Sequence, residues 1–175
     1  MPLPSQFASQ ISTDAVNACI NTGIFPSVVI AQAIEESGSG SSKLARMFNN
    51  LFGHMAGLGW LGKKGQTVPG GKYWRAYNSI GESVAAHIHI LTKPKYILAG
   101  VPTAKTPFEQ VIALQKAGYN TGPDREQYAL KLAKIIKGLG LQQYDQVLFK
   151  IERSKNNGLT YHEQSPATHI INKIV

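Results

Sequence analysis

Cysteine is nearly absent from this sequence of 175 residues, and no apolar run is long enough to cross a membrane. Cys19 is the single cysteine, so no disulfide can form within the chain, and we expect a small buried side chain there. The N-terminal segment Met1-Pro-Leu-Pro-Ser-Gln-Phe7 lacks the positive charge and apolar stretch of a signal peptide. The sequence therefore predicts neither a membrane span nor a secretory leader.

Metal-binding patterns are lacking as well. No Cys, His and Asp residues recur at the spacing of a zinc site. His87 and His89 stand two positions apart in a predicted helix and cannot point to one side of it. His54 follows a Phe-Gly pair in a predicted loop and is a candidate for a cleft residue. We expect no metal ion and no organic cofactor.

Acidic residues are scarce. The chain has 10 Asp and Glu against 18 Lys and Arg, which gives a net charge of +8. No acidic residue occurs in residues 37–81, which contain six basic ones: Lys43, Arg46, Lys63, Lys64, Lys72 and Arg75. An excess of positive charge suits a polyanionic partner, and nucleic acid, a membrane surface and a bacterial wall all fit it.

The most informative segment of the sequence is an apolar run that ends in two carboxyl groups. Residues 28–34 are all apolar except Gln32, which predicts a helix buried on every side. Pro26 favours the start of this helix, and Ser-Gly-Ser-Gly after Glu36 ends it. A carboxyl at the edge of an apolar core loses hydration, so its pKa rises and it suits a general acid. The alternative is that Glu35 and Glu36 only mark where the helix meets solvent.

Three blocks of sequence carry a resemblance. The first contains Ala31-Gln-Ala-Ile-Glu-Glu36-Ser-Gly-Ser-Gly40, then Ser42-Lys-Leu-Ala45 and Asn49-Asn-Leu-Phe-Gly53. The second contains Tyr73-Trp-Arg-Ala-Tyr-Asn-Ser79 and Glu82-Ser-Val-Ala-Ala-His87, and the third is Gly118-Tyr-Asn-Thr121. In order and spacing, over about residues 5–145, these blocks resemble the bacterial N-acetylglucosaminidases of glycoside hydrolase family 73, which are cell-wall hydrolases.

The resemblance implies a mainly α, α+β fold, namely a lysozyme-like helical domain with a small β-hairpin lobe. It implies that Glu36 is the catalytic acid and that Tyr119 contributes to activity by orienting the substrate's acetamide or a water. We predict that four further residues shape the sugar-binding sites: Asn50, Phe52, Trp74 and Tyr77. The alternative for the aromatic residues is that they fill a small hydrophobic core.

The chain also departs from the family pattern. Many relatives carry a second acidic residue in the β-hairpin, but the next carboxyl after Glu36 is Glu82, whose spacing from Ser79 predicts a helix capping box. Gly122 stands where relatives usually have Asp, and Tyr128 comes a few residues later than expected. A mechanism with two carboxylates therefore has no obvious second member, and participation of the substrate's own 2-acetamido group is a substitute.

The residue pattern predicts helices over residues 5–22, 26–36, 79–91, 107–117 and 124–137, a short helix capped by Ser41 or Ser42 that ends near residue 48, and a hairpin strand over 73–77. We expect a catalytic domain over residues 1–145. Residues 146–175 are expected to form a C-terminal extension that wraps the domain or docks onto a protein partner.

Together these patterns predict a peptidoglycan hydrolase, namely an endo-β-N-acetylglucosaminidase that cleaves the β-1,4 bond after N-acetylglucosamine. The alternatives are a muramidase or lytic transglycosylase of the same superfamily, and a non-catalytic wall-binding or phage structural module. Nucleic-acid binding is motivated by charge alone and leaves the Glu36 segment unexplained, so we expect no nucleic-acid partner. Action in the bacterial wall or periplasm without a signal peptide implies phage delivery, a dedicated export route or a leader outside this sequence.

Overall fold

The computed structural model describes residues 2–163, with side chains through residue 156. The helices are α1 (Pro4–Cys19), α2 (Pro26–Ser37), α3 (Lys43–Phe48), α4 (Ile80–Leu91), α5 (Pro94–Leu98), α6 (Pro107–Lys116), α7 (Tyr128–Gly138) and α8 (Gln142–Glu163), with a 3-10 turn η1 (Arg125–Gln127). The strands are β1 (Lys64–Gln66) and β2 (Tyr73–Arg75). The mainly helical α+β class predicted from the sequence is confirmed.

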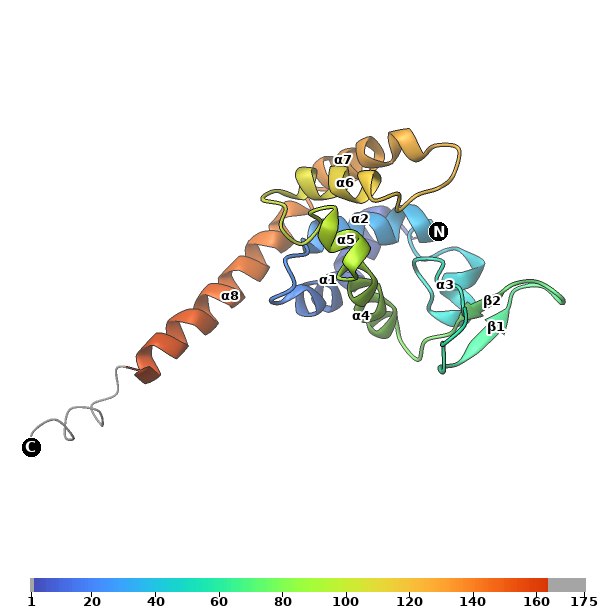
Figure 1. The fold of residues 1–175 in the computed structure, drawn as a ribbon, viewed down its shortest axis with the longest axis horizontal. Coiled ribbons are helices and arrows are strands. Elements are labelled where there is room, and N and C mark those ends of the chain that lie inside the picture. The colour runs from blue at the N-terminus through green and yellow to red at the C-terminus, as the bar shows by residue number, and fades with distance from the viewer. Residues whose placement is uncertain (1, 164–175) are drawn as a thin grey trace, which may run out of the picture.

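Helix α2 lies at the centre of the domain, in contact with α1, α6, α7 and α8 (Figure 1). Every residue from Pro26 to Ile34 is buried, which agrees with the prediction of a helix apolar on all sides. Pro26 occupies the first turn, where its missing N–H needs no partner, and Gly38 ends the helix in the left-handed conformation, with φ of 56°. Both predicted ends of this helix are confirmed.

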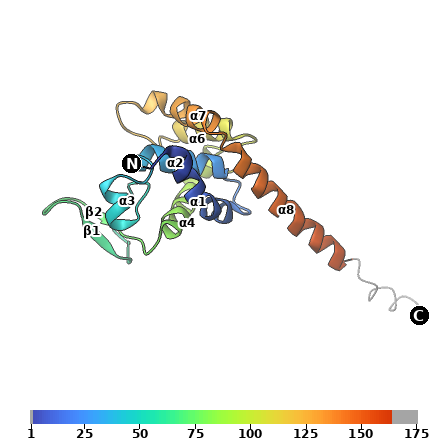
Figure 2. The ribbon, with the colours of Figure 1, turned by 180° about the vertical axis from the view of Figure 1, so that it is seen from behind.

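A small β lobe stands beside α3 (Figures 1 and 2). Its two strands are antiparallel, with Lys64 opposite Arg75 and Gln66 opposite Tyr73. The predicted strand over 73–77 therefore exists but ends at Arg75. A further bridge pairs Met55 with Trp74, so the loop after α3 also borders β2.

The predicted capping box at the start of α4 is present in altered form. The Ser79 hydroxyl accepts a hydrogen bond from the Glu82 amide at 3.1 Å. The Glu82 carboxylate, however, accepts a hydrogen bond from the backbone amide of Asn78 at 2.9 Å, and Asn78 is one residue before the cap. The structural role expected for Glu82 is thus met by a slightly longer reach than the usual box.

Helix α8 was not predicted, and it is continuous across residue 145, where we expected the domain to end. Its first turns pack on the body, and the remainder projects away from it (Figures 1 and 2). Leu148 is buried, and the Phe149 ring contacts the Phe25 ring edge-on, with centroids 6.1 Å apart. The Glu152 carboxylate accepts a hydrogen bond from the backbone amide of Asn21 at 2.8 Å. Residues 164–175, the rest of the expected extension, lie outside the described residues.

Asp145 of α8 caps the first turn of α2. Its carboxylate accepts a hydrogen bond from the Ser27 amide at 2.9 Å, and the side chain is buried. The amide is one of those that a helix N-terminus leaves without an intrahelical partner. Burial raises the pKa of Asp145 to about 6 from an ordinary value of 3.8. A residue from the last helix therefore stabilises the start of the central one.

We expect Asp145→Asn to change how stability depends on pH. Because the native pKa is raised, the native state binds a proton more tightly than the unfolded state between about pH 4 and pH 6. Wild-type stability therefore falls by up to ~3 kcal/mol as pH rises through this range, and the variant lacks this loss. Urea unfolding of both proteins at pH 4, 5, 6 and 7 measures the difference between their free energies of unfolding. The same substitution at the exposed Asp14 controls for loss of one charge. A difference that is equal at all four pH values would contradict the raised pKa.

Candidate active site

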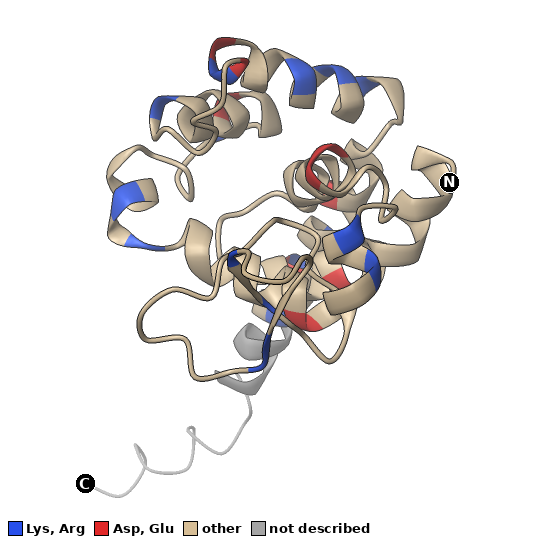
Figure 3. Cartoon of the chain, turned by 90° about the vertical axis from the view of Figure 1, so that its right-hand side faces the viewer, with Lys and Arg blue, Asp and Glu red and all other residues tan. Residues whose placement is uncertain are grey.

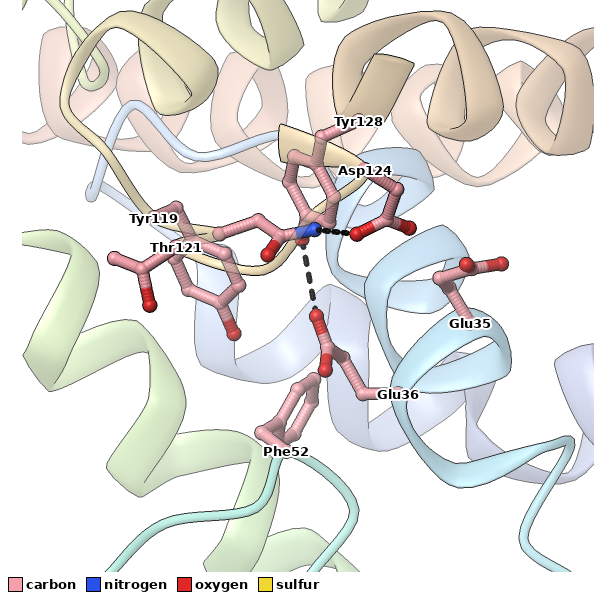
Figure 4. Close-up of a pocket in the computed structure, with 8 residues that line it drawn as sticks. Glu35, Glu36, Phe52, Tyr119, Thr121, Asp124 and Tyr128 are labelled. Atoms are coloured by element: carbon pink, nitrogen blue, oxygen red, sulfur yellow. Dashed lines mark hydrogen bonds between the residues drawn. The ribbon is translucent and has the colours of Figure 1, made fainter. Parts of the chain in front are cut away.

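Glu36 lies in the last turn of α2, at the point where this buried helix reaches the surface. It lines a cavity of about 420 Å³ (Figure 4). Glu35 of the same helix also lines it, and the other lining residues come from three further segments of the chain: Phe52, Tyr119, Asn120, Thr121, Asp124 and Tyr128. The fold therefore places the predicted acid, the predicted tyrosine and one predicted sugar-binding residue around the same cavity.

The pKa of Glu36 is raised above its ordinary value. The side chain opens onto the cavity, yet the protein atoms around it displace part of its hydration, and this desolvation is the main cause. The neighbouring charges of Glu35 and Asp124 raise the pKa further, while the Tyr128 hydrogen bond and the Lys131 charge oppose the rise. The direction is the one expected from the sequence, and it lets the carboxyl keep its proton closer to neutral pH.

Two stacked tyrosines form one wall of the cavity. The Tyr128 hydroxyl donates to Glu36 Oε1 at 3.4 Å and accepts from Gln32 Nε2 at 3.0 Å. The Tyr119 ring stacks on the Tyr128 ring, with centroids 5.5 Å apart at an angle of 21°. Burial raises the pKa of both phenols, so each hydroxyl remains neutral and available as a hydrogen-bond donor.

A further carboxylate, Asp124, borders the cavity from the loop before η1. It forms an ion pair with Lys131 and accepts from Asn120 Nδ2 at 3.1 Å. These hydrogen bonds hold the pKa of Asp124 below its ordinary value, so it is ionised. No second carboxylate was predicted because the family pattern places it in the β-hairpin, whereas Asp124 comes from the loop before η1.

Three of the residues predicted to bind sugar lie outside this cavity. Asn50 is fully buried, and its amide donates to the carbonyls of His54 and Arg75, each at 2.9 Å. Tyr77 is also buried, with its hydroxyl on His54 Nδ1 at 2.8 Å. Both side chains thus hold the loop after α3 against the segment around β2. Trp74 is half-buried in β2, and its contact with sugar stays a prediction.

Besides Asp124, two residues of the site were not predicted from the sequence, namely Gln32 and Tyr128. Gln32 carried a usable signal, because it is the one polar residue in an apolar run and stands one helical turn before Glu36. Tyr128 carried none locally, since its position in the apolar face of α7 is that of an ordinary core residue.

Within residues 2–163, no group of three or more His, Cys, Asp or Glu side chains is arranged to hold a metal ion. None of the helices described is both long and apolar enough for a membrane crossing.

Comparison with solved structures defines the class of this domain as a lysozyme-like glycoside hydrolase. The catalytic domain of the autolysin Auto from Listeria monocytogenes matches with a TM-score of 0.68 and 29% identity, over 83% of this chain and 89% of that one. The glycoside hydrolase domain of FlgJ from Salmonella typhimurium matches with a TM-score of 0.65 and 28% identity, over 91% and 99%. The chain belongs to the glucosaminidase family, whose model, described as mannosyl-glycoprotein endo-beta-N-acetylglucosaminidase, matches residues 12–141.

Similar proteins carry names of three kinds, exo-glucosaminidase, peptidoglycan hydrolase and N-acetylmuramidase. The exo-glucosaminidase LytG of Bacillus subtilis is 35% identical over 138 residues, which are 71% of this chain and 47% of LytG. The peptidoglycan hydrolase FlgJ of Salmonella typhimurium is 32% identical over 148 residues, 76% and 45% of the two chains. A probable N-acetylmuramidase of Lactococcus lactis is 32% identical over 156 residues, 79% and 34%. The chain spans about half the length of these relatives or less.

Proposed function

We propose that this chain hydrolyses the glycan strands of peptidoglycan at the β-1,4 bond after N-acetylglucosamine, with Glu36 as the general acid. The observation that carries this proposal is the position of Glu36, a carboxyl with a raised pKa at the mouth of a cavity in a domain of the glucosaminidase family. The names of LytG and FlgJ support the substrate and the bond.

In the proposed reaction, Glu36 gives its proton to the glycosidic oxygen as the bond between that oxygen and the anomeric carbon breaks. Positive charge then develops on the sugar ring, and water finally adds to the anomeric carbon while the Glu36 carboxylate takes up the proton that the water loses. Asp124 pairs with Lys131 and accepts a hydrogen bond from Asn120, and both contacts lower its pKa, so it is a weak base toward water. This favours attack by the substrate's own acetamide oxygen, with the Tyr119 hydroxyl orienting the acetamide group.

The charge distribution suits a polymer with acidic groups. The chain from residue 37 to residue 81, which contains α3 and the β lobe, has basic residues and no acidic ones. In Figure 3 the Lys and Arg positions are spread over many elements of the chain, and residues 37–81 contribute Lys and Arg but no Asp or Glu. We propose that the basic residues of the segment 37–81 bind the wall polymer and that the chain acts in the bacterial wall or periplasm. A protein partner that binds residues 146–175 is a separate hypothesis.

The test of the proposed function is a digest of purified peptidoglycan, reduced with borohydride and analysed by mass spectrometry. Products that end in reduced N-acetylglucosamine are expected. Reduced muramic acid ends would instead establish a muramidase, the activity named for the Lactococcus lactis relative, and anhydromuramic ends would establish a lytic transglycosylase. No product from several wall types would favour a wall-binding or structural module.

A further inference from the structure

A line of buried polar side chains runs from Glu36 through the core to the segment that follows the β lobe. From Tyr128, the first contact of Glu36, it continues to Gln32 at 3.0 Å. Gln32 Oε1 lies 3.0 Å from His87 Nε2, and His87 Nδ1 lies 3.3 Å from His54 Nε2. The far end is the Tyr77 hydroxyl, 2.8 Å from His54 Nδ1. Five side chains from α2, α4, α7 and two loops are thereby joined in series.

All the hydrogen bonds in this line run from donor to acceptor in the same direction. Because the Gln32 amide nitrogen faces Tyr128, the Tyr128 hydroxyl accepts that bond and its own proton points to Glu36. The Gln32 oxygen must then receive a proton from His87 Nε2. His87 Nδ1 is left as an acceptor for His54 Nε2–H, and His54 Nδ1 accepts from the Tyr77 hydroxyl. Each donor therefore points toward Glu36, and both imidazoles are neutral with the proton on Nε2.

Burial supports neutral histidines at both positions. It lowers the pKa of His54 to about 4 and the pKa of His87 well below the ordinary value, and the nearby charges of Arg75 and Lys93 act on His54 in the same direction. The Phe52 ring stacks on the His87 ring, with centroids 3.8 Å apart at an angle of 3°. Phe52 also lines the cavity, so one ring separates the substrate site from the histidines.

We infer that His87 and His54 are positioning residues for Glu36, because they fix the orientation of the Gln32 amide and thus direct the Tyr128 proton to the Glu36 carboxyl. The inference rests on the proposed role of Glu36 as the acid. Without His87 the amide can turn its oxygen toward Tyr128, and the hydroxyl would then donate to Gln32 in place of Glu36. The other charged groups that act on Glu36 are Glu35, Asp124 and Lys131, and none belongs to this line.

The wild-type protein provides the first test. Long-range proton–nitrogen NMR of protein labelled with ¹⁵N-histidine, recorded at pH 7, is expected to show His54 and His87 as neutral imidazoles protonated at Nε2. A proton on Nδ1 of either ring would reverse or break the line and overturn the inference. This measurement requires no substitution, so failure of a variant to fold does not affect it.

The second test measures the pKa of the Glu36 carboxyl by ¹³C NMR in three variants. Tyr128→Phe is expected to raise it by about one pH unit, since a hydrogen bond that stabilises the ionised form is lost. His87→Phe keeps a ring against Phe52 but removes both nitrogens, and we expect it to raise the pKa by part of that amount. The double variant is expected to match Tyr128→Phe, because His87 acts through Tyr128.

His89→Phe is the matched control, since His89 is exposed on the same helix. If His87→Phe does not fold, Gln32→Leu interrupts the line at its middle and carries the same expectation. An unchanged pKa in the folded variant, or a double variant with the sum of the two shifts, would overturn the inference. These results do not depend on catalysis, so they remain separate from the proposed function, which the digest and Glu36→Gln decide.

Discussion

Glu36→Gln is expected to reduce peptidoglycan hydrolysis by about 10²- to 10⁴-fold, the range that a general acid contributes. The amide has nearly the shape of the carboxyl but cannot give a proton to the leaving oxygen. Because Glu36 opens onto the cavity and lies at the end of α2, the substitution should leave the fold intact. Release of reduced saccharides per unit time measures activity, and circular dichroism during urea unfolding measures stability.

The neighbouring carboxyl provides the control for this prediction. Glu35 pairs with Lys131 at 3.3 Å, and Glu35→Gln should retain activity within about tenfold, since a surface charge contributes little. In the wild type, activity should decline as pH rises through the raised pKa of Glu36, because the acid must be protonated to act. Equal losses in the two variants would point to a general effect of charge, and a fully active, folded Glu36→Gln protein would exclude the proposed acid.

Gly23→Ala is expected to lower the free energy of unfolding by about 3 kcal/mol or more, a large part of the 5–15 kcal/mol typical of a domain. Gly23 has φ of +72°, and a Cβ there would lie 2.1 Å from the carbonyl oxygen of Pro102. Neither backbone can move away easily, because the buried Gln110 amide donates to the carbonyls of Gly23 at 2.9 Å and Val101 at 2.7 Å. Urea unfolding measures the loss.

Gly140→Ala separates the two causes of this loss. Gly140 has φ of +60°, but a Cβ added there would meet no atom within 4 Å, so only backbone strain of about 1 kcal/mol is expected. A similar loss in both variants would mean that the Pro102 contact adds nothing and that the two loops separate at low cost.

The parts of the fold predicted well from sequence depend on local signals. Pro26 begins α2 and Gly38 ends it, as predicted, and Ser42, one of the two serines expected as the cap of α3, accepts from the Ala45 amide at 3.1 Å. The position of Glu36 at the end of a buried helix followed from the same signals. Proline, glycine and capping residues restrict the backbone at their own position, so a single sequence is enough to interpret them.

The parts that were missed depend on contacts between distant segments. Asp124 and Tyr128 reach the cavity only because α7 packs against α2, and no local pattern reports that packing. His87 was considered only as a metal ligand, although its partners lie on α2 and in the loop after α3. Helix α8 was missed because its apolar positions also fit an irregular extension, and its buried Asp145 has its partner near the other end of the chain.

The path of α8 bears on how small an autonomous fragment of this protein can be. The match to the glucosaminidase family ends at residue 141, but a fragment cut there would lose the carboxylate that receives the Ser27 amide. It would also uncover the apolar surface that Leu148 and Phe149 now shield from water. The shortest fragment that keeps these contacts and the bond from Asn21 to Glu152 extends to residue 152, well beyond the segment that family likeness alone would delimit.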